Sequence, residues 1–166
     1  MSVFQQGILN GKVAFVTGGG SGIGQSIAER YAEYGAKVML NGRKQDKLDA
    51  AVERIRQRGG VAETFAADVR EFDAVEAGLR KTQEAWGPID ILLCGAAGNF
   101  PAPVAGMSDR GFKAVVDIDL LGTFNTCRAA YPLLRKPGAS VVSISAGHAS
   151  QPVPFQAHVC AAKAGV

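Results

Sequence analysis

A glycine-rich segment near the start of the chain has the composition of a phosphate-binding turn. It reads Thr17-Gly18-Gly19-Gly20-Ser21-Gly22-Ile23-Gly24, and it lies between a β-branched apolar run and a segment with helical periodicity. Glycines allow the backbone to approach a pyrophosphate closely, and the N–H groups at the start of the helix face the anion. Such a pattern is weak evidence alone and much stronger between a strand and a helix. The residues predicted to bind a dinucleotide here are Gly18, Gly20, Ser21, Gly22, Ile23 and Gly24.

Two further segments are placed to complete a dinucleotide site. After the apolar run 37–41 the sequence continues with Gly42 and Arg43, without an acidic side chain to bond the ribose hydroxyls of NAD. Arg43 offers positive charge to a 2′-phosphate instead, so the sequence favours NADP; a solvated arginine at a strand end is the alternative. Asp68 and Val69 follow the next apolar run. Asp68 either bonds the adenine amino group or caps the following helix, and Val69 packs on the ring.

Two titratable side chains in the second half of the chain are candidates for proton chemistry. Asp119 lies within the apolar helical stretch 114–131, where burial would raise its pKa and make it an acid near neutral pH. The alternative is a carboxylate that pairs with a neighbour. His158 stands at the start of a predicted helix, where it either relays a proton or serves as a cap or a packed ring.

Strand-like and helix-like segments alternate along the chain, which is the pattern of parallel strands joined by crossover helices. Each strand-like run is apolar enough to be buried on both faces. The five predicted strands are residues 13–17, 37–41, 61–66, 89–94 and 140–145. We therefore predict an α/β fold with a doubly wound, Rossmann-like parallel sheet and helices on both of its faces.

Composition and charge narrow the class of protein. The chain has 166 residues, of which 47% are hydrophobic and 20% charged, so residues 1–166 are predicted to form one domain with a real core. A net charge of +3, from 18 basic and 15 acidic side chains, is too small to indicate nucleic-acid binding.

The three cysteines and the lack of long apolar runs favour a reduced, non-membrane setting. Cys94, Cys127 and Cys160 match neither a metal cage nor a disulfide framework, and an odd number cannot all pair internally. No metal site is therefore predicted. No apolar run approaches the roughly 20 residues that span a bilayer, and the first ten residues do not resemble a secretion signal. We expect a cytoplasmic protein.

Taken together, these motifs resemble the short-chain dehydrogenase/reductase family over the whole chain. The resemblance rests on Thr17-Gly18-x-x-x-Gly22-x-Gly24, Asp68-Val69, Cys94-Gly95-Ala96-Ala97-Gly98 and the terminal Lys163-Ala164-Gly165. It implies a nicotinamide cofactor that Ala96 and Lys163 also contact. It further implies a homotetramer assembled through long helices, here residues 111–135 and the helix that begins near residue 157.

The catalytic residues that the resemblance implies are largely replaced. The family uses an Asn, a Ser, a Tyr and a Lys, and the Lys lowers the pKa of the Tyr, which exchanges a proton with the substrate oxygen. Here the Tyr position is Val159, the Ser position is Ala146 and the Asn position is Asp119, and only Lys163 is kept. Valine has no proton to give and alanine cannot hold an oxyanion, so ordinary carbonyl reduction is not expected.

One branch of the family, the 2,4-dienoyl-CoA reductases of the peroxisomal type and their bacterial relatives, resembles the chain at these positions. The shared features are Ala96-Ala97-Gly98-Asn99-Phe100, Asp117-Ile118-Asp119-x-x-Gly122-Thr123-Phe124-Asn125, Ser145-Ala146 and His158. In that branch a hydride from NADPH goes to carbon 5 of a conjugated diene, and a proton enters at carbon 2 to give a 3-enoyl-CoA. No oxygen is protonated in the product, so the lost phenol and hydroxyl are not needed.

This resemblance implies a role for each remaining candidate. Lys163 holds the nicotinamide ribose hydroxyls and supplies positive charge near the dienolate, and Asp119 delivers a proton through a water. Asn99 and Phe100 follow the fourth strand, where open α/β sheets bind ligands, and they contact the acyl-CoA; for Phe100 the alternative is a core residue. Arg70 either meets anionic groups of CoA or NADP or is a solvated arginine at a helix start.

The C-terminus stops within what reads as the opening turn of a helix. Family members run to roughly 250 residues as one domain, so we expect the C-terminal part of the fold to be missing. If 166 residues were the entire polypeptide, no efficient turnover is expected, because nothing would close the site and exclude water.

Three functions are compatible with these observations. The first is an NADPH-dependent 2,4-dienoyl-CoA reductase that acts in the degradation of unsaturated fatty acids, located in the peroxisome if the host is a eukaryote. The second is a non-catalytic NADP-binding module that serves as a partner subunit or regulator. The third is a reductase for another enone or ketone that uses Asp119 or His158 as its acid.

Overall fold

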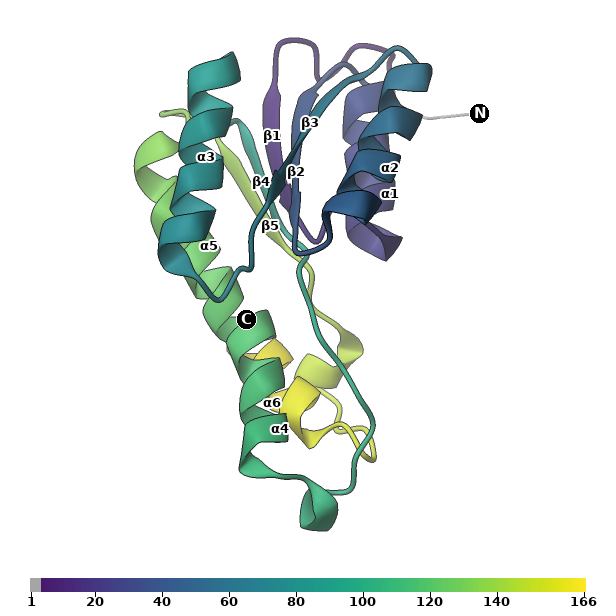
Figure 1. The fold of residues 1–166 in the computed structure, drawn as a ribbon, viewed down its shortest axis with the longest axis vertical. Helices are drawn as coiled ribbons and strands as arrows, with labels where there is room; N and C mark the ends of the chain where they lie inside the picture. Colours follow the sequence, from purple (N-terminus) through teal and green to yellow (C-terminus); the bar gives the residue numbers. More distant parts are fainter. Residues whose placement is uncertain (1–3) are drawn as a thin grey trace.

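The fold is built on a five-stranded parallel sheet. The computed structural model describes residues 4–166, and its strands are β1 (Val13–Thr17), β2 (Lys37–Gly42), β3 (Val61–Ala66), β4 (Ile91–Cys94) and β5 (Ser140–Ser143). Neighbouring strands all pair in parallel, in the order β3-β2-β1-β4-β5 (Figure 1). The order reverses between β1 and β4, which opens a crevice at the carboxyl ends of these strands. The predicted Rossmann-like α/β fold is confirmed.

Helices cover both faces of this sheet. On one face lie α1 (Gly22–Glu33) and α2 (Gln45–Gln57), and on the other lie α3 (Phe72–Trp86) and α5 (Gly122–Ala130), as Figure 1 shows. The remaining helical elements are α4 (Asp109–Val116), α6 (Ala157–Gly165), the π-helical turn η2 (Asp117–Leu121) and the short turns η1 (Val104–Gly106), η3 (Tyr131–Leu133) and η4 (Gly147–Ala149). Within residues 4–166 no helix has the length and apolar character needed to cross a bilayer.

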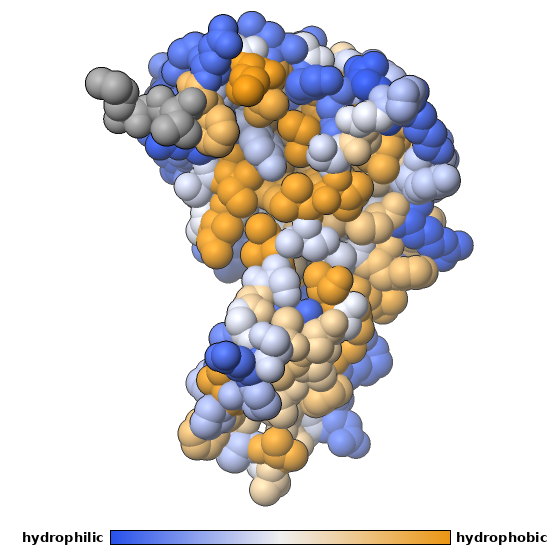
Figure 2. All heavy atoms as spheres, turned by 180° about the vertical axis from the view of Figure 1, so that it is seen from behind, coloured by the Kyte–Doolittle hydropathy of each residue, from blue (hydrophilic) through white to orange (hydrophobic). Residues whose placement is uncertain are grey.

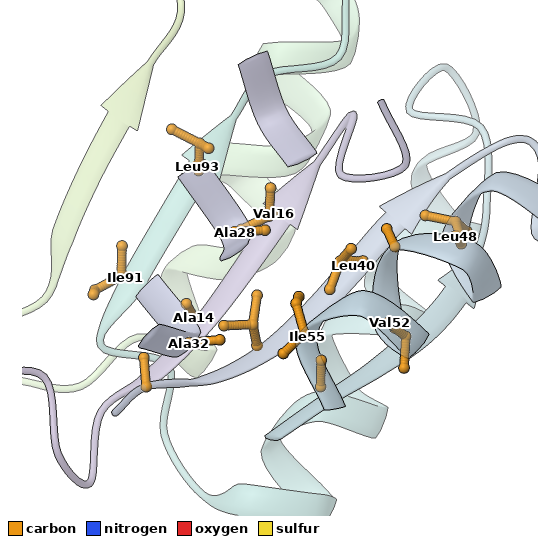
Figure 3. Packing of buried hydrophobic residues seen from close by; sticks show 14 residues of the cluster. Ala14, Val16, Ala28, Ala32, Leu40, Leu48, Val52, Ile55, Ile91 and Leu93 are labelled. Atoms are coloured by element: carbon orange, nitrogen blue, oxygen red, sulfur yellow. The ribbon is translucent and has the colours of Figure 1, made fainter. Parts of the chain in front are cut away.

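Alternate side chains of β1 enter two separate cores. Ala14 and Val16 belong to the core under α1 and α2, whereas Val13 and Phe15 belong to the core under α3 and α5. All residues of β1 are buried, as expected for a central parallel strand covered by helices on both faces. Figure 3 shows the first core, in which side chains of β1, β2 and β4 meet those of α1 and α2. These two cores hold the central strands, whose carboxyl ends border the crevice, in place.

The outer strands differ from the expectation that every strand is buried on both faces. In β3 only Ala62 is buried, and all four residues of β5 are exposed, including Val141 at 49% and Val142 at 41%. These strands are the edges of the sheet, and the described part of the chain leaves the side chains of β5 uncovered. Hydrophobic residues accordingly reach the surface of the sheet-bearing part of the molecule (Figure 2).

Strand β4 begins at Ile91, two residues later than predicted, because the chain before it makes other contacts. Asp90 is 3% exposed, and its carboxylate accepts hydrogen bonds from the Val13 N–H at 3.0 Å, from Lys12 Nζ at 3.1 Å and from Arg135 Nε at 2.5 Å. Burial raises the pKa of Asp90, but the hydrogen bonds from Arg135, Val13 and Lys12 outweigh it and leave the pKa below its ordinary value. Asp90 thus ties β1 to the segment after η3.

Replacing Asp90 with alanine is expected to lower the free energy of unfolding by about 1–3 kcal/mol, because the buried Val13 N–H loses its acceptor. Asp90→Asn keeps an acceptor but loses the charge, so its cost is expected to be smaller. A carboxyl with a depressed folded pKa stabilises the fold above its unfolded pKa, and this contribution is lost as the pH falls through the folded pKa. Urea unfolding should therefore show parent and Asp90→Asn converging below the ordinary carboxyl pKa of 3.8. An equal gap between them at neutral and acid pH would contradict this assignment.

Candidate functional site

The glycine-rich turn between β1 and α1 has the geometry of an anion cradle. Gly18 has a φ of +70°, and a Cβ added there would lie 2.7 Å from the Gly95 carbonyl oxygen; one added at Gly24 would lie 2.4 Å from the Gly18 carbonyl oxygen. The side chain of Ser21, the N-cap of α1, makes no capping hydrogen bond, and no acidic residue stands in the first turn. The N–H groups that begin α1 are therefore not capped by that side chain, and no carboxylate opposes a bound phosphate.

A pocket of about 300 Å³ opens beside this cradle. Of the residues predicted to bind a dinucleotide, it brings together Gly18, Gly20, Ser21, Arg43, Val69 and Ala96. Its other lining residues are Gly42, Lys44, Lys47, Leu48, Ala67, Ala97 and Ile118. Gly22, Ile23 and Gly24 instead form the first turn of α1, where the side chain of Ile23 is 64% exposed. The carboxyl ends of β1, β2 and β4 and the segment after β3 thus meet at one pocket.

Two lysines that were not predicted from the sequence add positive charge to this pocket. Lys44 and Lys47 line it together with Arg43, since the first two residues after Gly42 and the first turn of α2 turn toward the same opening. The signal in the sequence was the spacing Arg43-Lys44-x-x-Lys47 at the end of a strand. Three cations around one opening form a site suited to a phosphate group.

Asp68 and Arg70 bind each other. Arg70 donates from Nε to Asp68 Oδ1 at 3.0 Å and from Nη2 to Oδ2 at 2.6 Å, and its backbone N–H donates to Oδ1 as well. The hydrogen bond from Arg70 holds the pKa of Asp68 below its ordinary value, although burial opposes this shift. Asp68 does not occupy the N-cap of α3, which is Glu71. In this structure the guanidinium of Arg70 therefore faces Asp68 rather than the pocket, and contact between Arg70 and a substrate stays a prediction.

Asp119 is brought to the site by an irregularity that the sequence pattern did not reveal. It lies in the π-helical turn η2 between α4 and α5, and π-turns occur frequently at functional sites. Its side chain is 1% exposed, and Oδ1 accepts a hydrogen bond from the Gly98 N–H at 2.7 Å. Gly98 follows Ala97, and Asp119 follows Ile118, both of which line the pocket. The carboxylate is therefore buried next in sequence to lining residues, but Asp119 itself does not line the pocket.

Lys163 is the partner of this carboxylate. Its Nζ lies 3.1 Å from Asp119 Oδ2 and donates a hydrogen bond to the Ile144 carbonyl oxygen at 2.9 Å. The expected alternative for Asp119, a carboxylate paired with a neighbour, is thus what the structure shows, while Asp117 pairs with Lys113 on the outside of the helix. An ammonium group has three N–H donors, and within residues 4–166 the hydrogen bond to Ile144 uses one of them, so Lys163 keeps a free donor for a ligand.

The positions that hold a phenol and a hydroxyl in the family are apolar. Val159 lies one helical turn before Lys163 in α6 and is buried, and Ala146 follows β5 in the turn toward η4. The tyrosines of the chain are Tyr31 in α1, Tyr34 at the C-cap of α1 and Tyr131 in η3, so no tyrosine hydroxyl from α6 replaces the missing one. A buried carboxylate–ammonium pair without a neighbouring phenol can hold and transfer a proton, but it offers no hydroxyl to a substrate carbonyl.

His158, Phe100 and Asn99 do not line the pocket. The His158 ring is fully buried and packs on the Phe100 ring at a centroid distance of 4.6 Å. Among residues 4–166 neither ring nitrogen of His158 has a hydrogen-bond partner. Phe100 is 38% exposed, so it is not an ordinary core residue, and Asn99 is exposed. A packed ring, one of the two expected alternatives, is therefore the geometry of His158, and its part in proton relay stays a prediction.

The chain is similar to proteins of one enzyme family. A family model described as short chain dehydrogenase matches residues 12–166. The peroxisomal 2,4-dienoyl-CoA reductase SPS19 of Saccharomyces cerevisiae is 43% identical over 163 residues, which cover 96% of this chain and 56% of that protein. The peroxisomal 2,4-dienoyl-CoA reductase of Arabidopsis thaliana is 39% identical over 174 residues, covering 99% of this chain and 58% of that protein. The chain thus spans a little more than half the length of these relatives.

A solved structure supports the fold in detail. The citronellol catabolism dehydrogenase AtuB of Pseudomonas aeruginosa PAO1 superposes with a TM-score of 0.93 at 35% sequence identity. The superposition covers 99% of this chain and 67% of that one.

Proposed function

Since the chain belongs to the short-chain dehydrogenase family, we propose that it takes part in the NADPH-dependent reduction of a 2,4-dienoyl-CoA to a 3-enoyl-CoA. The observation that carries this proposal is the buried pair of Asp119 and Lys163, with Val159 and Ala146 where the family places its phenol and hydroxyl. The names of the relatives from yeast and Arabidopsis point to the same reaction.

The residues present fit conjugate reduction better than carbonyl reduction. The reduced nicotinamide supplies a hydride when it is bound. A dienoyl thioester that accepts a hydride at carbon 5 carries negative charge to its thioester oxygen and needs a proton only at carbon 2. The free N–H of Lys163 can stabilise that charge, and Asp119 can deliver the proton through a water. Val159 cannot protonate an alkoxide, so the reduction of a ketone would lack a proton donor at this position.

NADP fits the pocket because of its basic rim. Arg43, Lys44 and Lys47 present positive charge where the end of β2 would place the adenosine ribose. Val69 lines the pocket where the adenine ring would pack, whereas Asp68 pairs with Arg70 and does not line it, so its contact with the adenine amino group is part of this proposal alone. The 2′-phosphate of NADP thus has three candidate partners, whereas NAD has no acidic residue at the end of β2 for its ribose hydroxyls.

Arg43→Ala is expected to weaken NADPH binding by about tenfold or more, because a charge-assisted hydrogen bond to the 2′-phosphate is lost. NADH binding should change little, since NADH carries no phosphate at that position. Fluorescence titration of both dinucleotides measures the two affinities. Arg30→Ala, which removes an exposed arginine of α1 far from the pocket rim, is the matched control. Equal losses of affinity for NADPH and NADH would show that Arg43 does not bind the 2′-phosphate.

The reaction is tested by mixing NADPH and hexa-2,4-dienoyl-CoA with the full native polypeptide that carries this sequence. Loss of NADPH absorbance with the dienoyl thioester, and not with acetoacetyl-CoA, supports the proposal. Consumption with acetoacetyl-CoA alone or with both thioesters indicates a reductase for another enone or ketone. NADPH binding without any turnover indicates a non-catalytic module.

We also propose that the protein assembles into homo-oligomers. Leu121, Phe124 and Tyr131 are 41%, 55% and 66% exposed on the continuous helix formed by η2, α5 and η3. Large apolar side chains on one exposed helix are typical of a surface that another subunit covers.

A further inference from the structure

Two cysteines that are far apart in the sequence lie in contact beside the cofactor cradle. Cys94 is the last residue of β4 and is 4% exposed, and Cys127 lies in α5 and is half-buried. Their sulfur atoms are 3.8 Å apart. Cys160 belongs to α6, a different element. The spacing of the cysteines gave no sign of this contact, because it arises only when α5 packs across the end of β4.

The two thiols differ in the properties that govern oxidation. The hydrogen bond with Cys94 lowers the pKa of Cys127 to about 7, although burial opposes this shift. The same hydrogen bond and burial raise the pKa of Cys94. Cys127 is therefore the partly exposed thiolate that an oxidant would meet first, and Cys94 is the neighbouring thiol that can resolve the product.

We propose that Cys94 and Cys127 are a reversible redox site, which a peroxide converts to a disulfide that loosens the cofactor cradle. The Cys127 thiolate attacks one peroxide oxygen, which breaks the O–O bond and gives a sulfenic acid and hydroxide. The Cys94 sulfur then displaces the sulfenic hydroxyl, which leaves as water with the Cys94 proton, and the hydroxide takes up the proton that Cys127 had released. Two thiols and one hydrogen peroxide thus give one disulfide and two waters.

The new bond would move the end of β4. A disulfide bond is about 2.05 Å long, so the two sulfurs must approach by about 1.8 Å from their present 3.8 Å. Side-chain rotation can supply part of this movement. Whatever rotation does not supply falls on α5 and on the backbone of Cys94.

The backbone of Cys94 is linked to both halves of the site. The next N–H groups, those of Gly95 and Ala96, donate to Thr17 Oγ1 at 3.0 and 3.3 Å, directly before the glycine-rich turn. Gly18 leaves no room for a Cβ against Gly95, so the two backbones lie in close contact. On the other side the Cys94 carbonyl accepts the Ile144 N–H at 2.9 Å, and the Ile144 carbonyl accepts Lys163 Nζ. A shift of the Cys94 backbone would therefore displace both the glycine-rich turn and Lys163.

The test treats the native protein with hydrogen peroxide and maps its peptides without reduction. The expected result is a linked peptide pair containing Cys94 and Cys127, NADPH binding weakened by about tenfold, and recovery of both thiols and binding after dithiothreitol. Cys127→Ser should retain its NADPH affinity under peroxide, while Cys160→Ser should respond like the parent. Cys94→Ala is the second variant, and it should leave Cys127 without a disulfide partner. Thermal melting confirms that each variant is folded.

Two results would overturn the proposal. One is the absence of a Cys94–Cys127 link after peroxide treatment, whether the thiols are untouched, over-oxidised or joined to Cys160. The other is a linked pair with unchanged NADPH affinity, which would show that the disulfide does not affect the cradle. Neither readout depends on the substrate, so failure here is distinguishable from failure of the proposed reaction.

Discussion

Replacing Asp119 with asparagine is expected to lower the turnover of a dienoyl thioester by about a thousandfold, the scale of a lost acid–base group. Asparagine fills the same volume and can still accept the Gly98 N–H, so the fold of η2 should persist. It cannot carry the proton that the thioester needs at carbon 2, and it removes the charge that faces Lys163 at 3.1 Å. Steady-state kinetics measure the turnover. NADPH titration measures whether the pocket still binds the cofactor, and thermal melting measures whether the variant is folded.

Asp117→Asn is the matched control for this variant. Asp117 lies two residues away in the same π-turn, and its carboxylate pairs with Lys113 on the outer side of the helix. Its loss should leave turnover close to that of the parent. If Asp119→Asn turned over as fast as the parent, Asp119 would not deliver the proton. If Asp119→Asn lost NADPH binding as well, its role would be structural.

Gly24→Ala is expected to abolish dinucleotide binding, with a loss of about a hundredfold or more in affinity. The added Cβ would lie 2.4 Å from the Gly18 carbonyl oxygen and 2.9 Å from its carbonyl carbon, so the backbone of the cradle must move. Because Gly18 also packs against Gly95, there is no free side chain that can give way. Fluorescence titration with NADPH and with NADH should show the same loss for both, since the pyrophosphate is common to them.

Gly147→Ala provides the control for a glycine substitution. A Cβ at Gly147 meets no atom within 4 Å, and the residue lies in η4, outside the dinucleotide pocket. Its affinity for both dinucleotides should match that of the parent. Retained binding in Gly24→Ala, with an unchanged melting temperature, would mean that the glycine-rich turn does not cradle the phosphates.

The sequence predicted the parts of the fold that depend on local periodicity. The order of strands and helices followed from apolar runs alternating with helical stripes, and the glycine-rich turn followed from its place between β1 and α1. The start of α6 near Ala157 was also confirmed. These features are local, so neighbouring residues specify them.

The features that could not be predicted from the sequence depend on tertiary contacts. The burial of β3 and β5 depends on which strands lie at the sheet edges, and a run such as Val141-Val142 looks the same in either position. The π-turn around Asp119 and the pairing of Arg70 with Asp68 are likewise absent from any simple periodicity. Cys94 and Cys127 are 33 residues apart, and only the packing of α5 on β4 joins them.

The position of isotopic label in the product tests the proposed chemistry most directly. The full native polypeptide that carries this sequence is given hexa-2,4-dienoyl-CoA and NADPH deuterated at the transferable hydrogen, in ordinary water, and then unlabelled NADPH in deuterated water. Nuclear magnetic resonance of the product should place the cofactor's deuterium at carbon 5 and the solvent's deuterium at carbon 2 of a 3-enoyl-CoA. Cofactor deuterium at carbon 3, or reduction of an acetoacetyl-CoA carbonyl in place of the diene, would contradict the proposed hydride addition to carbon 5 beside the Asp119–Lys163 pair.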